Sequence, residues 1–227
     1  MELNYLLVKS RNRKKTISLR LRKDGVIVIQ APCGVPRSEI DRFFKSKHDW
    51  IHRKIGEKEE VRADSGPREF SPGEMFLFLG FSYPLIVDDA NNSGDPLNFS
   101  GRQFILKSDY VRHARDLFIQ WYKDKAREYI EERTRHYSLI LDLQPRHVRI
   151  GNAVSRWASC SYHNHLSFTW RLIMAPCPVI DYVVVHELVH IKEKNHSQRF
   201  WNLLKKTVPD YGSQRLWLKK RGYLLDF

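Results

Sequence analysis

The sequence contains few cysteines and no long run of hydrophobic residues. Cys33, Cys160 and Cys177 are odd in number, and none has the CxxC spacing that is typical of metal-binding or redox-active pairs. No stretch approaches the roughly 20 apolar residues that span a bilayer. The N-terminus also lacks the basic region, apolar core and cleavage site of a signal peptide. We therefore expect a cytoplasmic protein that has no membrane partner.

Other sequence signals are missing as well. There is no glycine-rich P-loop and no cluster of carboxylates suited to Mg²⁺, which argues against an enzyme that hydrolyses nucleotides. Internal repeats and low-complexity segments are also absent from the sequence. The chain has 227 residues, of which 42% are hydrophobic and 12% aromatic, so it can bury the core of one large globular domain or two small ones.

Positive charge is in excess, because 39 lysines and arginines stand against 26 aspartates and glutamates, giving a formal net charge of +13. A charge of this size bears on partners and solubility, and not on the fold. Two interpretations stay open: a solvated surface, or attraction to nucleic acid, ribosomes or acidic proteins, although no DNA- or RNA-binding motif accompanies the charge. Eight basic residues form what we call the N-terminal basic cluster: Lys9, Arg11, Arg13, Lys14, Lys15, Arg20, Arg22 and Lys23.

The most informative feature is an HExxH motif, in which His186 and His190 flank Glu187 and His196 follows further on. Residues i and i+4 of an α-helix lie on the same face, so His186 and His190 can reach one ion together. Glu187 lies about 100° round the helix from His186. A catalytic zinc typically takes three protein ligands and leaves a fourth position for water. The motif therefore predicts one zinc ion held by three histidines, with Glu187 beside it as general base.

The third ligand follows from distance along the helix. Glu193 lies near the face of His186 at i+7, but it is roughly 10 Å further along the axis and hard to bring to the same ion. A chain that leaves the helix and turns at Asn195 can bring in His196, since asparagine tolerates the left-handed conformation. Ser197 then suits the cap of a following helix. The spacing equals the metzincin pattern, but Glu193 replaces its glycine and no Met-turn is evident.

Apolar residues surround the motif, which predicts a buried helix. Buried histidines and a buried glutamate need partners, and one metal ion satisfies them all. The alternative is a helix that packs in the core and binds no metal. Three neutral imidazoles leave the ion its full charge, which lowers the pKa of a bound water from about 16 towards about 7. Glu187 would take the water proton and pass it to the leaving amine. The candidates for a donor to the developing oxyanion are Arg156, Tyr182 and Tyr211.

Several segments near the motif form a recognisable signature: Ser155–Ser161, Leu166–Ile173, Val179–Leu188, Asn195–Ser197 and Phe200–Trp201. This signature resembles that of the YgjP-like metallopeptidases and, more distantly, that of the SprT-type zinc proteases. The match is dense over about residues 145–225 and looser towards the N-terminus. The resemblance implies that the three histidines bind zinc and that Glu187 is the catalytic base. Ala158 and Thr169 stand where the signature predicts glycine and asparagine, which bears on substrate preference more than on the metal.

The order of elements predicts an α+β protein. Residues 1–107 are expected to form a small β-rich unit with one helix, and residues 108–227 a zincin-like catalytic domain that carries the HExxH helix. An Asp24-Gly25 turn between two β-rich runs indicates a hairpin. Residues 166–173 are predicted to be a strand, at the edge of its sheet or inside it. The expected helices cover residues 38–56, 108–138, 179–194, 197–207 and 213–221, and the further expected strands 16–22, 26–30, 74–87, 103–107, 148–150 and 159–161.

The leading hypothesis is a zinc-dependent peptidase that acts on a protein or peptide substrate. The first alternative is a metal-dependent hydrolase of a nucleotide or another phosphorylated small molecule, which the positive charge favours. A second alternative is a nucleic-acid-associated protein with a mainly structural metal site. Structural zinc sites usually have four protein ligands, so three histidines with an adjacent glutamate argue against it.

Overall fold

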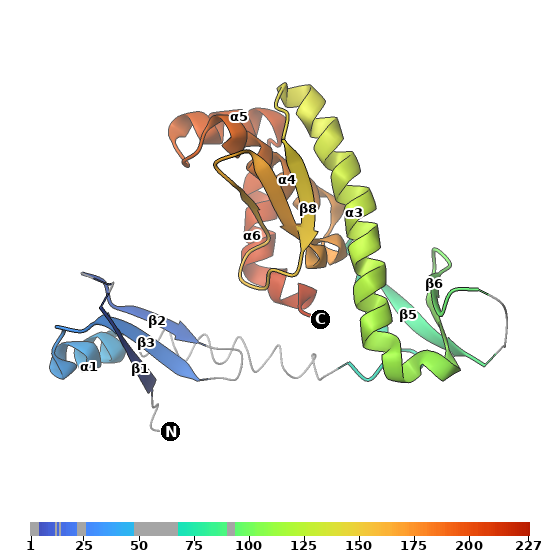
Figure 1. The fold of residues 1–227 in the computed structure, drawn as a ribbon, viewed down its shortest axis with the longest axis horizontal. Coiled ribbons are helices and arrows are strands. Elements are labelled where there is room, and N and C mark those ends of the chain that lie inside the picture. Colours follow the sequence, from blue (N-terminus) through green and yellow to red (C-terminus); the bar gives the residue numbers. More distant parts are fainter. Residues whose placement is uncertain (1–4, 12, 14, 22–25, 48–67, 90–93) are drawn as a thin grey trace. The chain divides into compact units, whose positions relative to one another are not determined.

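The computed structural model describes residues 5–11, 13, 15–21, 26–47, 68–89 and 94–227 (Figure 1). The chain divides into two compact units, Met1–Pro67 and Arg68–Phe227. Within the described residues, α-helices and three small sheets make up the two units, in agreement with the predicted α+β class. Among these residues, no helix combines the length and the apolar composition that crossing a membrane requires.

The smaller unit consists of a three-stranded sheet and one helix. Strand β3 lies between a parallel β1 and an antiparallel β2, so the predicted hairpin pairing is confirmed, while its Asp24-Gly25 turn lies outside the described residues. A small core forms around the buried side chains of Ile29 and Ile40. The expected helix of residues 38–56 is described as far as Ser46, and residues 48–56 lie outside the described part. The elements are β1 (Tyr5–Ser10), β2 (Ser18–Leu21), β3 (Ile27–Pro32) and α1 (Arg37–Ser46).

The N-terminal basic cluster belongs to this smaller unit. Arg13 donates hydrogen bonds to the side chains of Ser18 and Gln30, both at 2.9 Å, so this guanidinium ties β2 to β3. Lys14, Arg22 and Lys23 lie outside the described residues. At least one member of the cluster therefore has a structural role in addition to its charge.

The larger unit is built along one long helix, α3. Figure 1 shows β5 and β6 beside the start of α3, and α4 and β8 beside its C-terminal half. The sequence pattern predicted one helix over residues 108–138, but its first six residues form the 3-10 turn η1. The elements are β4 (Met75–Phe78), β5 (Phe81–Asp88), β6 (Leu97–Phe99), β7 (Phe104–Lys107), η1 (Ser108–His113), α3 (Ala114–Leu141), β8 (His147–Gly151), β9 (Ala158–Cys160), β10 (His165–Thr169), η2 (Trp170–Met174), α4 (Cys177–Lys192), α5 (Gln198–Thr207), α6 (Tyr211–Arg221) and η3 (Gly222–Leu225).

Strands β4–β7 share the core of α3. The rings of Phe76 on β4 and Phe118 on α3 stack with centroids 4.2 Å apart, and Phe104 on β7 lies 5.1 Å from Phe118. The division between the units therefore falls at Pro67, earlier than the boundary expected after residue 107. Phe76 is fully buried in this core, whereas Phe81 at the start of β5 is 67% exposed.

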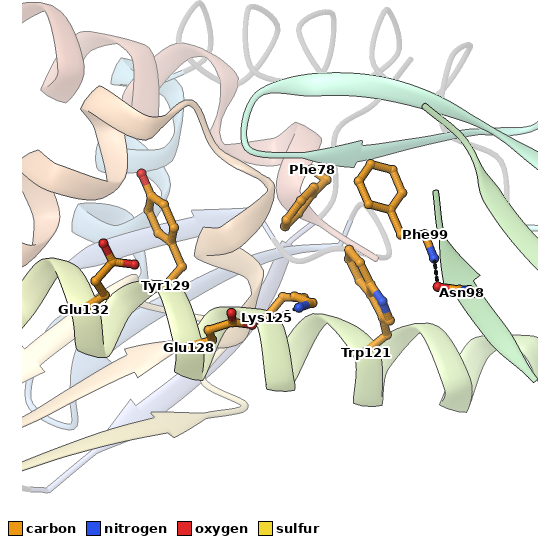
Figure 2. Close-up of a pocket in the computed structure, with 8 residues that line it drawn as sticks. All are labelled: Phe78, Asn98, Phe99, Trp121, Lys125, Glu128, Tyr129 and Glu132. Carbon is orange, nitrogen blue, oxygen red and sulfur yellow. Dashed lines mark hydrogen bonds and ion pairs between the residues drawn. The ribbon is translucent and has the colours of Figure 1, made fainter. Parts of the chain in front are cut away.

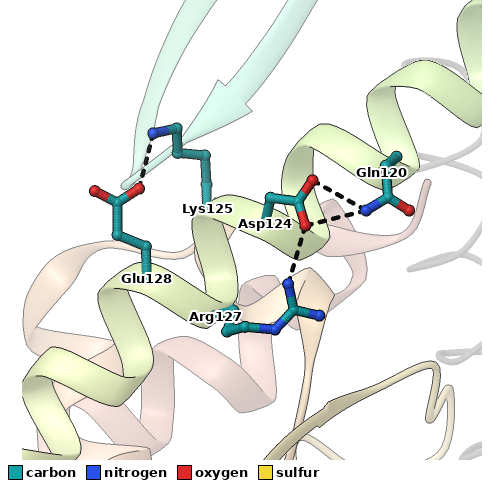
Figure 3. Close-up of polar contacts among 5 residues, drawn as sticks. All are labelled: Gln120, Asp124, Lys125, Arg127 and Glu128. Atoms are coloured by element: carbon teal, nitrogen blue, oxygen red, sulfur yellow. Dashed lines mark hydrogen bonds and ion pairs between the residues drawn. The ribbon is translucent and has the colours of Figure 1, made fainter.

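The exposed face of α3 carries side-chain pairs at helical spacing. Figure 3 shows Asp124 accepting hydrogen bonds from Gln120 and Arg127, and Lys125 paired with Glu128 at 2.8 Å. Such i,i+3 and i,i+4 pairs stabilise a helix by about 0.2–0.5 kcal/mol each. They support the solvent side of α3, while its buried side holds the core.

The sheet nearest the HExxH motif has the strand order β8-β10-β9. Strand β10 is parallel to β8 and antiparallel to β9, so it is an interior strand. The sequence left open whether the strand predicted over residues 166–173 lies at the edge of its sheet or inside it, and the structure shows that it lies inside. The strand also ends at Thr169, because residues 170–174 form η2. Strand β9 is one edge of this sheet and contacts α4.

Candidate metal centre

The HExxH motif lies on α4, a buried helix. Pro178 occupies its first turn, where the missing N–H costs no hydrogen bond, and apolar residues cover most of its surface. The helix ends at Lys192, and Glu193 is already extended. The prediction of a left-handed turn at Asn195 was wrong, because the chain leaves the helix two residues earlier and Asn195 has no positive φ.

Three imidazoles converge beside α4. His186 and His190 project from the helix one turn apart, and His196 arrives from the loop that follows it. One ring nitrogen from each lies within 4.8 Å of the others, and the Nε2 atoms of His186 and His196 are 3.0 Å apart. Nitrogens on a tetrahedral zinc, at about 2.0–2.1 Å from the ion, are about 3.3 Å apart. The donor set and its spacing therefore fit one zinc ion.

The loop after α4 is shaped by specific hydrogen bonds. Ser197 caps α5, since its Oγ accepts a hydrogen bond from the backbone N–H of Phe200, as the sequence predicted. The carbonyl oxygen of Glu193 lies 3.0 Å from Nδ1 of His190. This carbonyl can only accept, so Nδ1 carries the proton and Nε2 keeps its lone pair for a metal, which is the usual support of a zinc-bound histidine.

Aromatic rings lie against the three imidazoles. Phe200 is buried, and its ring centroid lies 4.7–4.9 Å from those of His186, His190 and His196. Trp201 stacks on His196 at 5.5 Å. Phe200 and Trp201 therefore pack against the motif and form an apolar wall beside His186 and His190, whereas His196 is exposed.

Burial favours the neutral form of His186 and His190. Burial, reinforced by the charges of His190, His196 and Arg215, lowers the pKa of His186 to about 3. Burial also lowers the pKa of His190, although its hydrogen bond to the Glu193 carbonyl acts in the opposite direction. Only the neutral imidazole binds a metal. The Nδ1 atom of His186 is buried and has no hydrogen-bond partner among the described residues.

Glu187 faces the edge strand β9. Its side chain is buried, with the residue 7% exposed, and a backbone hydrogen bond from Cys160 reaches its carboxylate. Burial raises the pKa of Glu187 to about 7, while this bond and the charge of Arg156 partly lower it. A carboxyl group with a pKa near neutrality can both take and release a proton at neutral pH.

The other predicted site residues also lie around the histidines. The Tyr182 ring is 5.7 Å from that of His186, and Tyr211 stacks on Trp201 at 5.4 Å. Burial raises the pKa of Tyr182, so its hydroxyl stays protonated and able to donate. Arg156 is exposed and close enough to influence Glu187 electrostatically.

Arg215 is the neighbour that sequence reasoning missed. Its guanidinium lies 5.4 Å from the centroid of the Trp201 ring, and its charge acts on both His186 and Tyr182. The available signal was its i,i+4 spacing from Tyr211 on the same helix, which puts both residues on one face of α6.

A separate pocket of about 320 Å³ lies between α3, β4 and β6. Figure 2 shows its aromatic lining by Phe78, Phe99, Trp121 and Tyr129, with the charged side chains of Lys125, Glu128 and Glu132 nearby. None of the three histidines contributes to it. We therefore locate the candidate chemistry at the converging ligand atoms and not at this cavity.

Comparison with known proteins shows the family to which the chain belongs. A metallopeptidase family model, described as "YgjP-like, metallopeptidase domain", matches residues 15–221, and the chain belongs to this YgjP-like family. The metallopeptidase zymogen abylysin of Pyrococcus abyssi, known from a crystal structure, is 24% identical with a TM-score of 0.37. That match covers 40% of this chain and 93% of the abylysin chain. No curated protein matches the chain.

Proposed function

We propose that this protein is a zinc-dependent peptidase with a zincin-like catalytic domain, in which His186, His190 and His196 hold one zinc ion. The observation that carries the proposal is the convergence of three imidazoles next to a buried glutamate. Membership of a metallopeptidase family supports peptide bonds as the target. A zinc ion bound there would supply Lewis acidity, polarising a carbonyl and acidifying water.

Glu187 is the proposed general base. It is adjacent in sequence to a ligand, buried, and has a pKa of about 7, so it can accept a proton from water and return it to the leaving amine. The hydroxyl of Tyr182, that of Tyr211 and the guanidinium of Arg156 are the proposed donors to the developing oxyanion.

Strand β9 is the proposed docking edge for an extended peptide. It is an edge strand of its sheet, it contacts α4, and Cys160 on it is hydrogen-bonded to Glu187. Peptides often bind by adding a strand to such an edge, where main-chain hydrogen bonds hold them in place. A peptide paired along Ala158–Cys160 would pass next to the base.

The decisive experiment replaces Glu187 by glutamine. The variant should retain about one zinc per chain by elemental analysis and lose peptidase turnover by about 10²- to 10⁴-fold, the usual contribution of a general base. Glu128→Gln on the exposed face of α3 is the matched control and should keep full activity. Loss of zinc from Glu187→Gln would make this residue a ligand and refute the mechanism.

The same preparations distinguish the other candidate functions. A phosphohydrolase should release phosphate from nucleotides and leave peptides intact, and a protein with a structural metal site should turn over neither. Peptide cleavage that depends on both zinc and Glu187 is the result expected from the proposal. Phosphate release lost in Glu187→Gln would replace it with the hydrolase of phosphorylated substrates.

A further inference from the structure

Three cations surround the candidate metal centre. Arg156 acts electrostatically on Glu187, Lys194 on His190, and Arg215 on His186. All three side chains are exposed. None of them forms an ion pair with a carboxylate in the part of the chain that the structure describes: Lys194 donates to the side-chain oxygen of Asn164 at 2.6 Å, and Arg215 lies over Trp201. The approach to the histidines therefore carries three cations that form no ion pair among the described residues.

Of these three cations, Arg215 is the one whose guanidinium lies over an aromatic ring. Its guanidinium lies 5.4 Å from the Trp201 ring centroid, and the Trp201 ring itself stacks on His196 at 5.5 Å and on Tyr211 at 5.4 Å. An arginine on an aromatic face is restrained in its plane, yet the N–H groups at its edge stay available. Through the Trp201 ring, the guanidinium of Arg215 is therefore linked to His196, a candidate metal ligand.

The chemistry of a guanidinium selects the ligand. Its planar fork of N–H donors matches a carboxylate, which it binds with two parallel hydrogen bonds. Positive potential around a site also raises the local concentration of anionic substrates. We propose that Arg215 forms a carboxylate-binding subsite beside the metal centre, so that the enzyme prefers peptides with an acidic side chain or a free C-terminal carboxylate near the scissile bond. This inference rests on the proposed peptidase function and names its substrate class.

The competing interpretation is that Arg215 is only a solvated surface residue of α6. Arg221, on the same helix, provides the comparison, because it is exposed too and has no aromatic partner or candidate ligand beside it in the described structure. Replacing either arginine by glutamine removes the same charge from the same helix. A non-specific effect of net charge should therefore appear equally in both variants.

The experiment uses the zinc-loaded full chain and matched fluorogenic peptides. Each set carries aspartate, asparagine or alanine at positions within two residues of the scissile bond, and each peptide is made with a free and with an amidated C-terminus. In kcat/KM, the wild type should favour the acidic peptide over its matched amide by about tenfold, mainly through a lower KM. This factor is at the low end for a hydrogen bond to a charged group, because Arg215 is exposed. The position at which the preference occurs distinguishes a side-chain carboxylate from the C-terminal one.

The variants decide the assignment. In Arg215→Gln the acid-to-amide ratio should fall to about one, Arg215→Lys should retain part of it, and Arg221→Gln should retain all of it. Zinc content should be unchanged in each, which excludes collapse of the site. A ratio near one in the wild type, or a ratio that survives in Arg215→Gln, overturns the subsite. A loss of kcat that is equal for acidic and neutral peptides also overturns it, because the guanidinium would then act on the reacting group.

Binding separates this inference from the peptidase proposal. Fluorescence anisotropy with Glu187→Gln measures affinity for the same peptides without turnover, and acidic peptides should bind about tenfold more tightly until Arg215 is also replaced. If the wild type cleaves peptides without acid preference, only the subsite fails. If it cleaves none but the anisotropy preference depends on Arg215, only the peptidase proposal fails. If no peptide is cleaved or bound, both fail.

Discussion

Breaking the ion pair between Arg133 and Asp181 should loosen the attachment of the HExxH helix. Arg133 on α3 donates through Nε to one carboxylate oxygen of Asp181 on α4 at 2.7 Å, and through an Nη to the other at 3.0 Å. The hydroxyl of Tyr137 also lies 3.1 Å from this carboxylate. Asp181 precedes His186 by less than two helical turns, so this bidentate contact fixes the part of α4 that carries the first candidate ligand.

The magnitude follows from how deeply the pair is buried. The side chains of Arg133 and Asp181 are 24% and 18% exposed, which lies between a surface pair and a buried one. Exposed pairs contribute about 0–1 kcal/mol, whereas removing one partner of a buried pair costs about 3–5 kcal/mol. We therefore expect Asp181→Ala to lower the free energy of unfolding by about 2 kcal/mol, of which most should reappear as coupling energy in a double-mutant cycle with Arg133→Ala.

The assay is urea unfolding of the four proteins of the cycle, with the metal removed so that zinc binding does not add to the measured stability. Lys125 and Glu128 supply the control cycle, since they form a similar ion pair with side chains 43% and 69% exposed (Figure 3). Its coupling energy should be no more than about 0.5 kcal/mol. A coupling energy between Arg133 and Asp181 no larger than this control would refute the argument from burial.

Three further predictions concern the metal, the base and the basic cluster. His196→Ala should lose most of the bound zinc in elemental analysis, because two remaining imidazoles hold the ion less tightly, and full retention would remove His196 from the site. In the metal-free protein, burial raises the pKa of Glu187 from 4.5 to about 7, so the stability held by its protonated form is lost as the pH rises from 4.5 through 7. The free energy of unfolding of Glu187→Gln relative to wild type, measured in urea, should therefore rise by about 3 kcal/mol between pH 4.5 and pH 8. If the N-terminal basic cluster binds nucleic acid, anisotropy titrations should show affinity falling with salt, with a slope of about −0.9 per phosphate contact on duplex DNA, whereas no binding near about 50 mM salt would favour a solvated surface.

Local signals predicted the elements around the candidate site. The apolar residues of α4 predicted burial, the i,i+4 spacing put His186 and His190 on one face, and Ser197 marked the start of α5. Each of these depends on a few neighbouring residues, for which helix geometry and capping chemistry are decisive. The convergence of the ligands was predictable for the same reason, because all three histidines come from one short segment.

Long-range pairing was harder to predict. Residues 166–169 form an interior strand because both β8 and β9 pair with them, and no local pattern distinguishes that from an edge. The early strands were assigned to the N-terminal unit because they are β-rich, yet the ring of Phe76 stacks on Phe118 of α3 and joins them to the larger core. Arg215 was missed because its relation to the histidines passes through Trp201, on a different helix.

The third ligand depends on the loop between α4 and α5 more than on the HExxH motif itself. Glu193 contributes its carbonyl to His190 and its carboxylate to the hydroxyl of Ser197, at 3.0 and 3.4 Å, so one residue connects a helix ligand to the cap that follows His196. Lys194 ties the same loop to the β9–β10 turn through Asn164. The loop therefore relates the histidines to the edge strand on which we propose that the peptide docks. Ligand geometry and substrate position are set by the same few contacts, and a change in this loop should affect both.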